Sequence, residues 1–228
     1  MTPPRFPPRL RLYYSPKACS LASHLALAES GLDYEAIPVN IRANEHRRPE
    51  YLALNPSGTV PALGIDDAIL TESQAVLTYI ADLAPERRLL PRPGTLARAR
   101  ALEWMNLISS SLHAAFRSIF RAGRLVGDDA DAQVAVRRVA HDRLEALLLD
   151  IDRRLAGGQH ALEEHYTVVD AYLFVFYLWS HDERLERPMP ALPAYRSLAL
   201  QVLGRPTTQK VLERERAIRA YDLPPGFL

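Results

Sequence analysis

The residues with the clearest chemical potential lie between Asn55 and Ser73. Pro61 has no N–H to donate, so at the start of a strand it leaves a neighbouring backbone group unpaired, and the Val60–Pro61 bond can be cis at small cost. With a cis bond there, the amide and carbonyl of Val60 would turn outward. An extended peptide could then pair with them as an added strand does.

Thr71, Glu72 and Ser73 follow a predicted hairpin and precede apolar residues at helical spacing, namely Val76, Tyr79, Ile80 and Leu83. This spacing predicts that the three residues open a helix. The free N–H groups and the positive dipole end of a helix suit a carboxylate or another anion. Glu72 adds an acceptor for an ammonium group, so the whole zone suits a short zwitterionic peptide.

Cys19 is the single cysteine of the chain and lies where the first predicted strand meets the first helix. Free amides and the helix dipole at such a position lower the pKa of a thiol and favour the thiolate. A free cysteine is also commonly a small buried hydrophobic residue, and its position leaves both readings open. Because Cys19-Ser20-Leu21-Ala22 has no second cysteine, an intramolecular dithiol cycle is excluded, and reductive chemistry would need an external thiol.

Two domains are predicted to position these residues. Residues 9–84 read as β-α-β-α-β-β-α, with strands at 10–14 and 34–39, a helix at 19–30 ended by Gly31, and a turn of helix at 49–53. The linker 85–94 contains three prolines and a glycine, and 1–8 is expected to be a disordered leader. Residues 95–222 read as an all-helical domain with helices at 95–126, 128–155, 167–179, 192–203 and 206–220.

On the first of these helices, polar residues recur at helical spacing along one face: Glu103, Asn106, Ser110, His113 and Arg117. A stripe of this kind is usually a solvated face. The remaining histidines show no paired ligand spacing, so no metal site is expected.

The composition argues against nucleic-acid-binding and membrane-bound classes of protein. The 228-residue chain has a net charge of +1, which gives no electrostatic reason for a nucleic acid or an acidic membrane as partner. No apolar run reaches the length of a membrane span. A single cysteine fits a reducing compartment, so a cytoplasmic protein is expected.

Several segments together resemble one family: LYYSPKACSLASHLALAESGLDYE, NPSGTVPAL, LTES and HYTVVDAYLF. In this order and spacing they are similar to the cytosolic glutathione transferase superfamily, most of all to its bacterial beta class, over roughly Leu10 to Ile218. The resemblance implies a glutathione transferase fold, α/β plus all-α, in which a thioredoxin-like domain precedes an all-helical bundle. It also implies a homodimer with glutathione as co-substrate.

The resemblance assigns roles to individual residues. Cys19 matches the beta-class cysteine that contacts the glutathione sulfur and can form a mixed disulfide with it. His113 and Asn106 in EWMNLISSSLH match the segment whose histidine projects into the cleft between domains. The glutathione-binding positions are Thr59, Val60, Pro61, Glu72 and Ser73. Other classes activate the thiol with a tyrosine or serine hydroxyl, so Tyr14 and Ser15 remain alternatives, with Ser20 a weaker third; His24 is expected to be structural.

The chain departs from the family pattern near the site. Lys17 stands where a small residue is frequent, and Ala43-Asn44 and Ala114 stand where lysines are frequent. Fewer cations near the peptide's carboxylates would weaken binding unless Lys17, Arg47 or Arg48 replaces them. Ser73, where glycine is common, adds a hydroxyl donor.

The expected activity is conjugation of the glutathione thiolate to small apolar electrophiles, with a role in detoxification and with thiol-disulfide exchange through Cys19 as an added reaction. Phe116, Phe120 and Leu125 are candidates for an apolar acceptor pocket, or else simply pack. The alternatives are a glutathione-dependent thiol-disulfide reductase and a non-catalytic binding protein on the same scaffold.

Overall fold

The computed structural model describes residues 8–162 and 165–224, which fall into two compact units. The first unit comprises residues 8–91 together with Gly204–Asp222, and the second comprises residues 92–203 with 223–224. The predicted leader, 1–8, lies outside the described residues except for Pro8.

In the described part of the first unit, four strands form one sheet in the order β2-β1-β3-β4. Strand β1 (Leu10–Tyr14) pairs in parallel with β2 (Tyr34–Pro38) and antiparallel with β3 (Ala62–Ile65), which pairs antiparallel with β4 (Ala68–Thr71). Every second residue of β1 is buried, as its alternating sequence predicts. The predicted β-α-β-α-β-β-α order is therefore confirmed.

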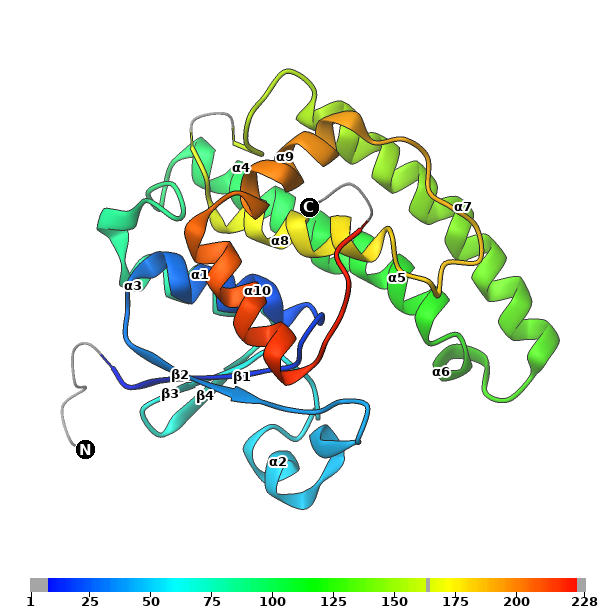
Figure 1. Cartoon of the computed structure of the whole chain (residues 1–228), viewed down its shortest axis with the longest axis horizontal. Coiled ribbons are helices and arrows are strands. Elements are labelled where there is room, and N and C mark those ends of the chain that lie inside the picture. The colour runs from blue at the N-terminus through cyan, green and yellow to red at the C-terminus, as the bar shows by residue number, and fades with distance from the viewer. Residues whose placement is uncertain (1–7, 163–164, 225–228) are drawn as a thin grey trace. The chain divides into compact units, whose positions relative to one another are not determined.

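Helices cover both faces of this sheet (Figure 1). Helices α1 (Ser20–Ser30) and α3 (Ser73–Leu83) pack together on one face, and the short α2 (Pro49–Leu54) lies on the other. Gly31 ends α1 in the left-handed conformation, with φ of 72°. Two short 3₁₀ turns, Glu45–Arg47 and Pro85–Arg87, precede α2 and follow α3.

The last helix, α10 (Pro206–Ile218), packs on α1 and belongs to the first unit (Figure 1). The boundary drawn from sequence, 95–222, placed it in the helical domain. Val211 and Leu212 give α10 a buried face. Periodicity shows that a helix has such a face but does not say which partner covers it.

In the second unit all described elements are helical: α4 (Leu96–Asn106), a π-helical segment (Leu107–Leu112), α5 (His113–Phe120), α6 (Gly123–Val126), α7 (Ala130–Leu155), α8 (Val168–Trp179) and α9 (Pro193–Leu203). Every residue of α8 is buried, which matches its apolar sequence. The predicted capping box is present. The Thr167 hydroxyl accepts a hydrogen bond from the backbone of the first helical turn, and the Asp170 carboxylate accepts one from the Thr167 N–H. This helix forms the centre of the bundle.

The prediction of one helix over 95–126 is wrong. A π-helical segment interrupts it, and the helix ends at Phe120. The Ser109 and Ser110 hydroxyls both donate to the Asn106 carbonyl, and such bonds compete with regular helix bonds. Because a π turn contains more residues than an α turn, Asn106 and His113 do not continue one straight polar stripe.

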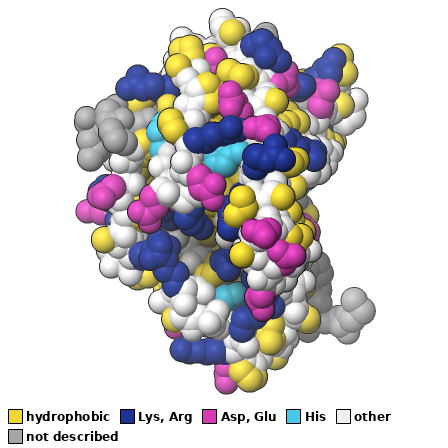
Figure 2. Space-filling view, turned by 90° about the vertical axis from the view of Figure 1, so that its right-hand side faces the viewer, with side chains coloured by type: hydrophobic (Ala, Val, Ile, Leu, Met, Phe, Trp, Pro, Cys, Tyr) yellow, Lys and Arg dark blue, Asp and Glu magenta, His cyan; other side chains and the backbone are white. Residues whose placement is uncertain are grey.

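Basic and acidic side chains are interspersed on the face shown in Figure 2. Their mixture agrees with a net charge near zero. Within residues 8–162 and 165–224, we find no helix that is both long enough and apolar enough to span a membrane.

Candidate functional site

The hairpin of β3 and β4 brings the two ends of the Asn55–Ser73 stretch together. Ala62 pairs with Thr71, so Pro61 and Glu72 lie at the same end of the hairpin. The Val60–Pro61 peptide bond is cis, as the sequence suggested. In the part of the chain that the structure describes, the Val60 N–H has no hydrogen-bond partner, and its carbonyl accepts a bond from the Cys19 thiol.

The segment before Val60 is held by α2. The Tyr51 hydroxyl and the Asn55 side-chain amide both donate to the Thr59 carbonyl, at 2.6 and 2.9 Å. Asn55 also accepts from the Ser57 N–H, and the Tyr51 ring packs beside Val60. Sequence reasoning missed this supporting role, although an asparagine opening an Asn-Pro-Ser-Gly turn is a signal for it.

Gly58 allows the turn that begins at Asn55 to close, because its N–H donates to the Asn55 carbonyl. Its φ is 56°, and a Cβ atom there would lie 2.8 Å from the His46 carbonyl oxygen. We expect Gly58→Ala to lose about 2–4 kcal/mol of unfolding free energy, because backbone strain and a clash with main chain add up. Urea denaturation measures this loss.

Gly94→Ala is the matched control. Gly94 also has a left-handed φ, of 80°, but no atom lies within 4 Å of the position that a Cβ atom would occupy. It should lose only about 1 kcal/mol, the cost of the backbone conformation. Equal losses in the two variants would contradict the contact with His46.

Glu72 and Ser73 form the beginning of α3. Glu72 is the N-cap residue, is exposed, and has a φ of 67°, which few residues other than glycine adopt. Ser73 is the first helical residue and is buried. Strained backbone at an exposed carboxylate beside a helix N-terminus is typical of a binding site.

Cys19 occupies the N-cap position of α1, with 8% of its surface exposed. Its sulfur lies 3.4 Å from the Val60 carbonyl oxygen. Burial raises the pKa of the Cys19 thiol from an ordinary 9.0 to about 11, against smaller lowering effects from the Ser73 hydroxyl and from backbone N–H groups. The expectation of a lowered pKa is therefore wrong, because the desolvation cost outweighs the helix terminus.

The residues that carry the alternative hydroxyls, Tyr14, Ser15 and Ser20, are all buried. Tyr14 is 1% exposed, and its ring packs 4.7 Å from that of His24. The Ser20 hydroxyl donates to the Ser15 carbonyl and accepts from the Ser15 N–H. Tyr14 and Ser20 are thus part of the support of this region, and the Ser15 backbone is held in place.

The cations near the site are arranged differently from the family pattern. The Arg47 guanidinium lies against the Gly58 turn, where a Cβ atom on Gly58 would be 2.9 Å from it. Arg48 pairs instead with Glu45, at 3.7 Å. Arg47 therefore lies beside the turn that precedes Thr59.

Asn106 and His113 belong to the second unit and are described within it. Asn106 is exposed at the end of α4. The His113 ring lies 5.3 Å from the rings of both Phe176 and Trp179. Burial, with a smaller contribution from the Arg117 charge, lowers the pKa of His113 from 6.5 to about 4, so its imidazole is neutral near pH 7.

This lowered pKa makes the protein sensitive to acid. A histidine that is held neutral stabilises the fold above its unfolded pKa of 6.5, and this contribution is lost as the pH falls through about 4. Between pH 7 and pH 4, unfolding free energy should therefore fall by up to about 3 kcal/mol more in the unaltered protein than in His113→Gln. Chemical denaturation at the two pH values tests this. Parallel losses in both proteins would refute it.

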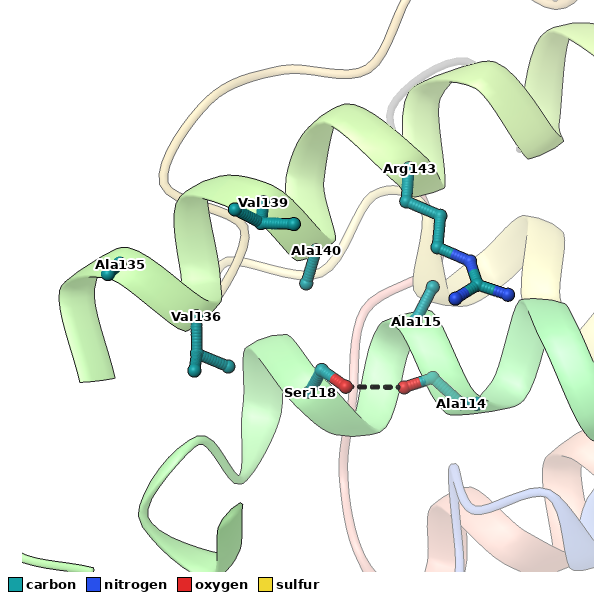
Figure 3. Close-up of a pocket in the computed structure, with 8 residues that line it drawn as sticks. All are labelled: Ala114, Ala115, Ser118, Ala135, Val136, Val139, Ala140 and Arg143. Carbon is teal, nitrogen blue, oxygen red and sulfur yellow. Dashed lines mark hydrogen bonds between the residues drawn. The ribbon is translucent and has the colours of Figure 1, made fainter. Parts of the chain in front are cut away.

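An apolar pocket of about 410 Å³ lies between α5 and α7 in the second unit (Figure 3). Alanine and valine side chains line most of it, and Ser118 and Arg143 complete the lining. Phe116, Phe120 and Leu125, the candidates from sequence, do not line it. Phe116 and Phe120 pack against Trp179 instead, and Leu125 is exposed.

Comparison with known proteins gives a consistent result. A family model described as the N-terminal domain of glutathione S-transferase matches residues 8–82. Glutathione S-transferase GstA from Escherichia coli O157:H7 is 32% identical over 208 residues, which are 90% of this chain and 98% of that protein.

Solved structures agree with the sequence comparison. A sphingomonad glutathione S-transferase in complex with glutathione has 35% identity and a TM-score of 0.78, covering 90% of this chain and 98% of that one. The bacterial beta class glutathione S-transferase of Sphingomonas chungbukensis has 34% identity and a TM-score of 0.77, with the same coverage. The likeness thus extends over nearly the whole length of both chains.

Proposed function

Because the chain belongs to the glutathione S-transferase family and is similar to its bacterial beta class, we propose that it conjugates the thiolate of glutathione to small apolar electrophiles. The observation that carries this proposal is the hairpin end, where the Val60 backbone and the Glu72–Ser73 helix terminus lie together. Its donors and acceptors match an extended peptide with charged ends.

In the proposed complex, the cysteinyl backbone of glutathione pairs with the N–H and carbonyl of Val60. When glutathione binds, its amide can take the place of the Cys19 thiol at the Val60 carbonyl, which frees the single S–H of Cys19. The γ-glutamyl end lies at Glu72 and Ser73, where its ammonium meets a carboxylate and its carboxylate meets helix N–H groups. Thr59 and Pro61 shape the adjoining backbone, and Arg47 supplies a cation.

The chemistry of Cys19 favours conjugation. With a pKa of about 11, the Cys19 thiol is protonated near neutral pH. A protonated thiol can donate a hydrogen bond to the glutathione thiolate and so stabilise it. As a nucleophile of its own it is weak, because only roughly one molecule in ten thousand is ionised at pH 7.

We propose His113 as a catalytic residue and Asn106 as a glutathione-binding residue, because their segment resembles the matching segment of the beta class. A neutral imidazole retains one N–H, which suits donation of a hydrogen bond to a thiolate. It is poorly suited to protonate a leaving group near pH 7, since its pKa is about 4.

The test is a calorimetric titration of reduced glutathione into the unaltered protein and into Cys19→Ala, with a reductant present. We expect binding to both, followed by conjugation of aromatic halides that is slower without Cys19. Turnover of a mixed disulfide without conjugation would select the reductase instead. Absence of glutathione binding to either protein would contradict the proposal and favour a non-catalytic binding protein.

We also propose a cytoplasmic homodimer with a role in detoxification, as the family resemblance implies. Exposed apolar residues on α6 and α7 support a surface that a second copy covers: Leu125, Val134 and Val139 are 64%, 59% and 59% exposed. Sedimentation should give a dimer for the unaltered protein and a weaker one for Val139→Asp. A monomer at micromolar concentration would contradict this assembly.

A further inference from the structure

Glu215 lies on the side of α10 that packs against α1, in the interior of the first unit. Its side chain and that of His24 on α1 are both 0% exposed. One carboxylate oxygen lies 2.9 Å from His24 Nδ1, and the other accepts a bond from the Lys17 N–H at 3.3 Å. A single side chain thus joins the last helix, the middle of α1 and the loop between β1 and α1.

The Glu215 carboxylate and His24 lie in closely packed, buried surroundings. The rings of Tyr14 and Tyr34 pack against His24, at 4.7 and 5.9 Å. Burial raises the pKa of Glu215, while the bonds from His24 and Lys17 work in the opposite direction. Because a buried carboxylate needs partners, losing either bond should disturb the other.

The Lys17 backbone depends on such an attachment. Its φ is 63°, a left-handed conformation that residues other than glycine seldom adopt. On the strand side the loop is fixed by the pair of hydrogen bonds between Ser15 and Ser20. Within the loop the Ala18 N–H donates to the Ser15 carbonyl, and the bond from the Lys17 N–H to Glu215 attaches the loop to α10, two residues before Cys19.

We propose that Glu215 is a positioning residue for Cys19: through Lys17 it fixes the loop that keeps the thiol buried and directed at the Val60 carbonyl. The effect on catalysis rests on the proposed function, whereas the effect on the thiol does not. Residues distant by 198 positions in the chain would thereby set the reactivity of the site.

A second polar link between the same two helices supplies a matched control. Arg205, at the start of α10, donates two hydrogen bonds to Glu29 near the end of α1, at 2.7 and 2.8 Å. Glu29→Ala therefore weakens the attachment of α10 to α1 without touching Lys17. This variant distinguishes the effect of a loosened α10 from the effect of losing the hydrogen bond between Glu215 and Lys17.

The experiment measures how fast Cys19 reacts with 4,4′-dithiodipyridine in the absence of glutathione. Since the chain has one cysteine, the released thiopyridone reports on Cys19 alone. We expect labelling about tenfold faster in Glu215→Ala, and also faster in the milder Glu215→Asp, whose shorter side chain cannot span both partners. Glu215→Gln, which keeps an oxygen for Lys17, and Glu29→Ala should stay within about threefold of the unaltered rate.

Two outcomes would overturn the proposal: an unchanged rate in both Glu215→Ala and Glu215→Asp, or equal acceleration in Glu29→Ala and Glu215→Ala at equal unfolding free energy. Conjugation is measured in parallel, and Glu215→Ala should lower kcat/KM about tenfold while Glu215→Gln restores it. If the unaltered protein shows no conjugation, the proposed function fails, yet the labelling rates still decide the role of Glu215.

Discussion

Glutathione should bind to Glu72→Ala about 10- to 150-fold more weakly than to the unaltered protein, the loss expected for a hydrogen bond to a charged group. Glu72 is exposed at the beginning of α3 and lies at the same end of the hairpin as Val60. Isothermal calorimetry at fixed ionic strength measures the change.

The control is Asp67→Asn, which removes one negative charge from the turn between the same two strands. Asp67 is exposed at the other end of β4. Its replacement should leave affinity within about twofold, because a screened charge at that distance contributes little. A similar loss in both variants would show that net charge, and not a contact at Glu72, determines binding.

Glu72→Gly separates binding from stability. Glycine adopts a φ of 67° without strain, so this variant should gain roughly 1 kcal/mol of unfolding free energy while losing affinity. A gain in stability together with weaker binding is what a strained binding residue predicts. Loss of both would mean that Glu72 is mainly structural.

Raising the pH from 8 to 11 should cost the unaltered protein about 2 kcal/mol more unfolding free energy than it costs Cys19→Ala. The folded pKa of Cys19, about 11, lies above the ordinary 9.0. Below pH 9 both states keep the proton and the full contribution is present. Between pH 9 and pH 11 the unfolded state ionises while the folded state still holds its proton, so stability falls until the pH has passed the folded pKa.

The difference between the unaltered protein and Cys19→Ala isolates the contribution of the Cys19 thiol to the pH dependence of stability. Buried tyrosines also titrate in this range, and burial raises the pKa of Tyr51 to about 12, but both proteins retain every tyrosine. The cavity left by Cys19→Ala shifts the whole curve without changing its slope. Superimposable slopes would show that Cys19 ionises in the folded protein as readily as in the unfolded one, and the hydrogen-bond donor role would be lost.

Local sequence patterns predicted much of the fold and of the backbone conformation between Asn55 and Ser73. Alternation in β1, the glycine after α1 and the capping box before α8 are each set by neighbours in the chain. The cis bond before Pro61 and the helix beginning at Ser73 are local as well. These features could be predicted because nearby residues decide them.

The predictions that failed depend on contacts between distant segments. The pKa of Cys19 follows from how deeply tertiary packing buries it, which the sequence around Cys19 does not show. The π-helical segment arises where Ser109 and Ser110 bond back to the helix, one of several conformations open to serines. Glu215 contacts His24 across 191 positions, so neither residue indicates its partner.

The first unit is built from both ends of the chain. A ribosome releases residues 8–91 early, but α10, which packs on α1, is synthesised only after the helices of the second unit. Until then His24 and Glu29 lack Glu215 and Arg205, and the apolar side of α1 facing α10 stays open. The first unit therefore stays incompletely folded until more than 110 further residues have been synthesised, and a truncation that removes α10 would destabilise the unit that was started first.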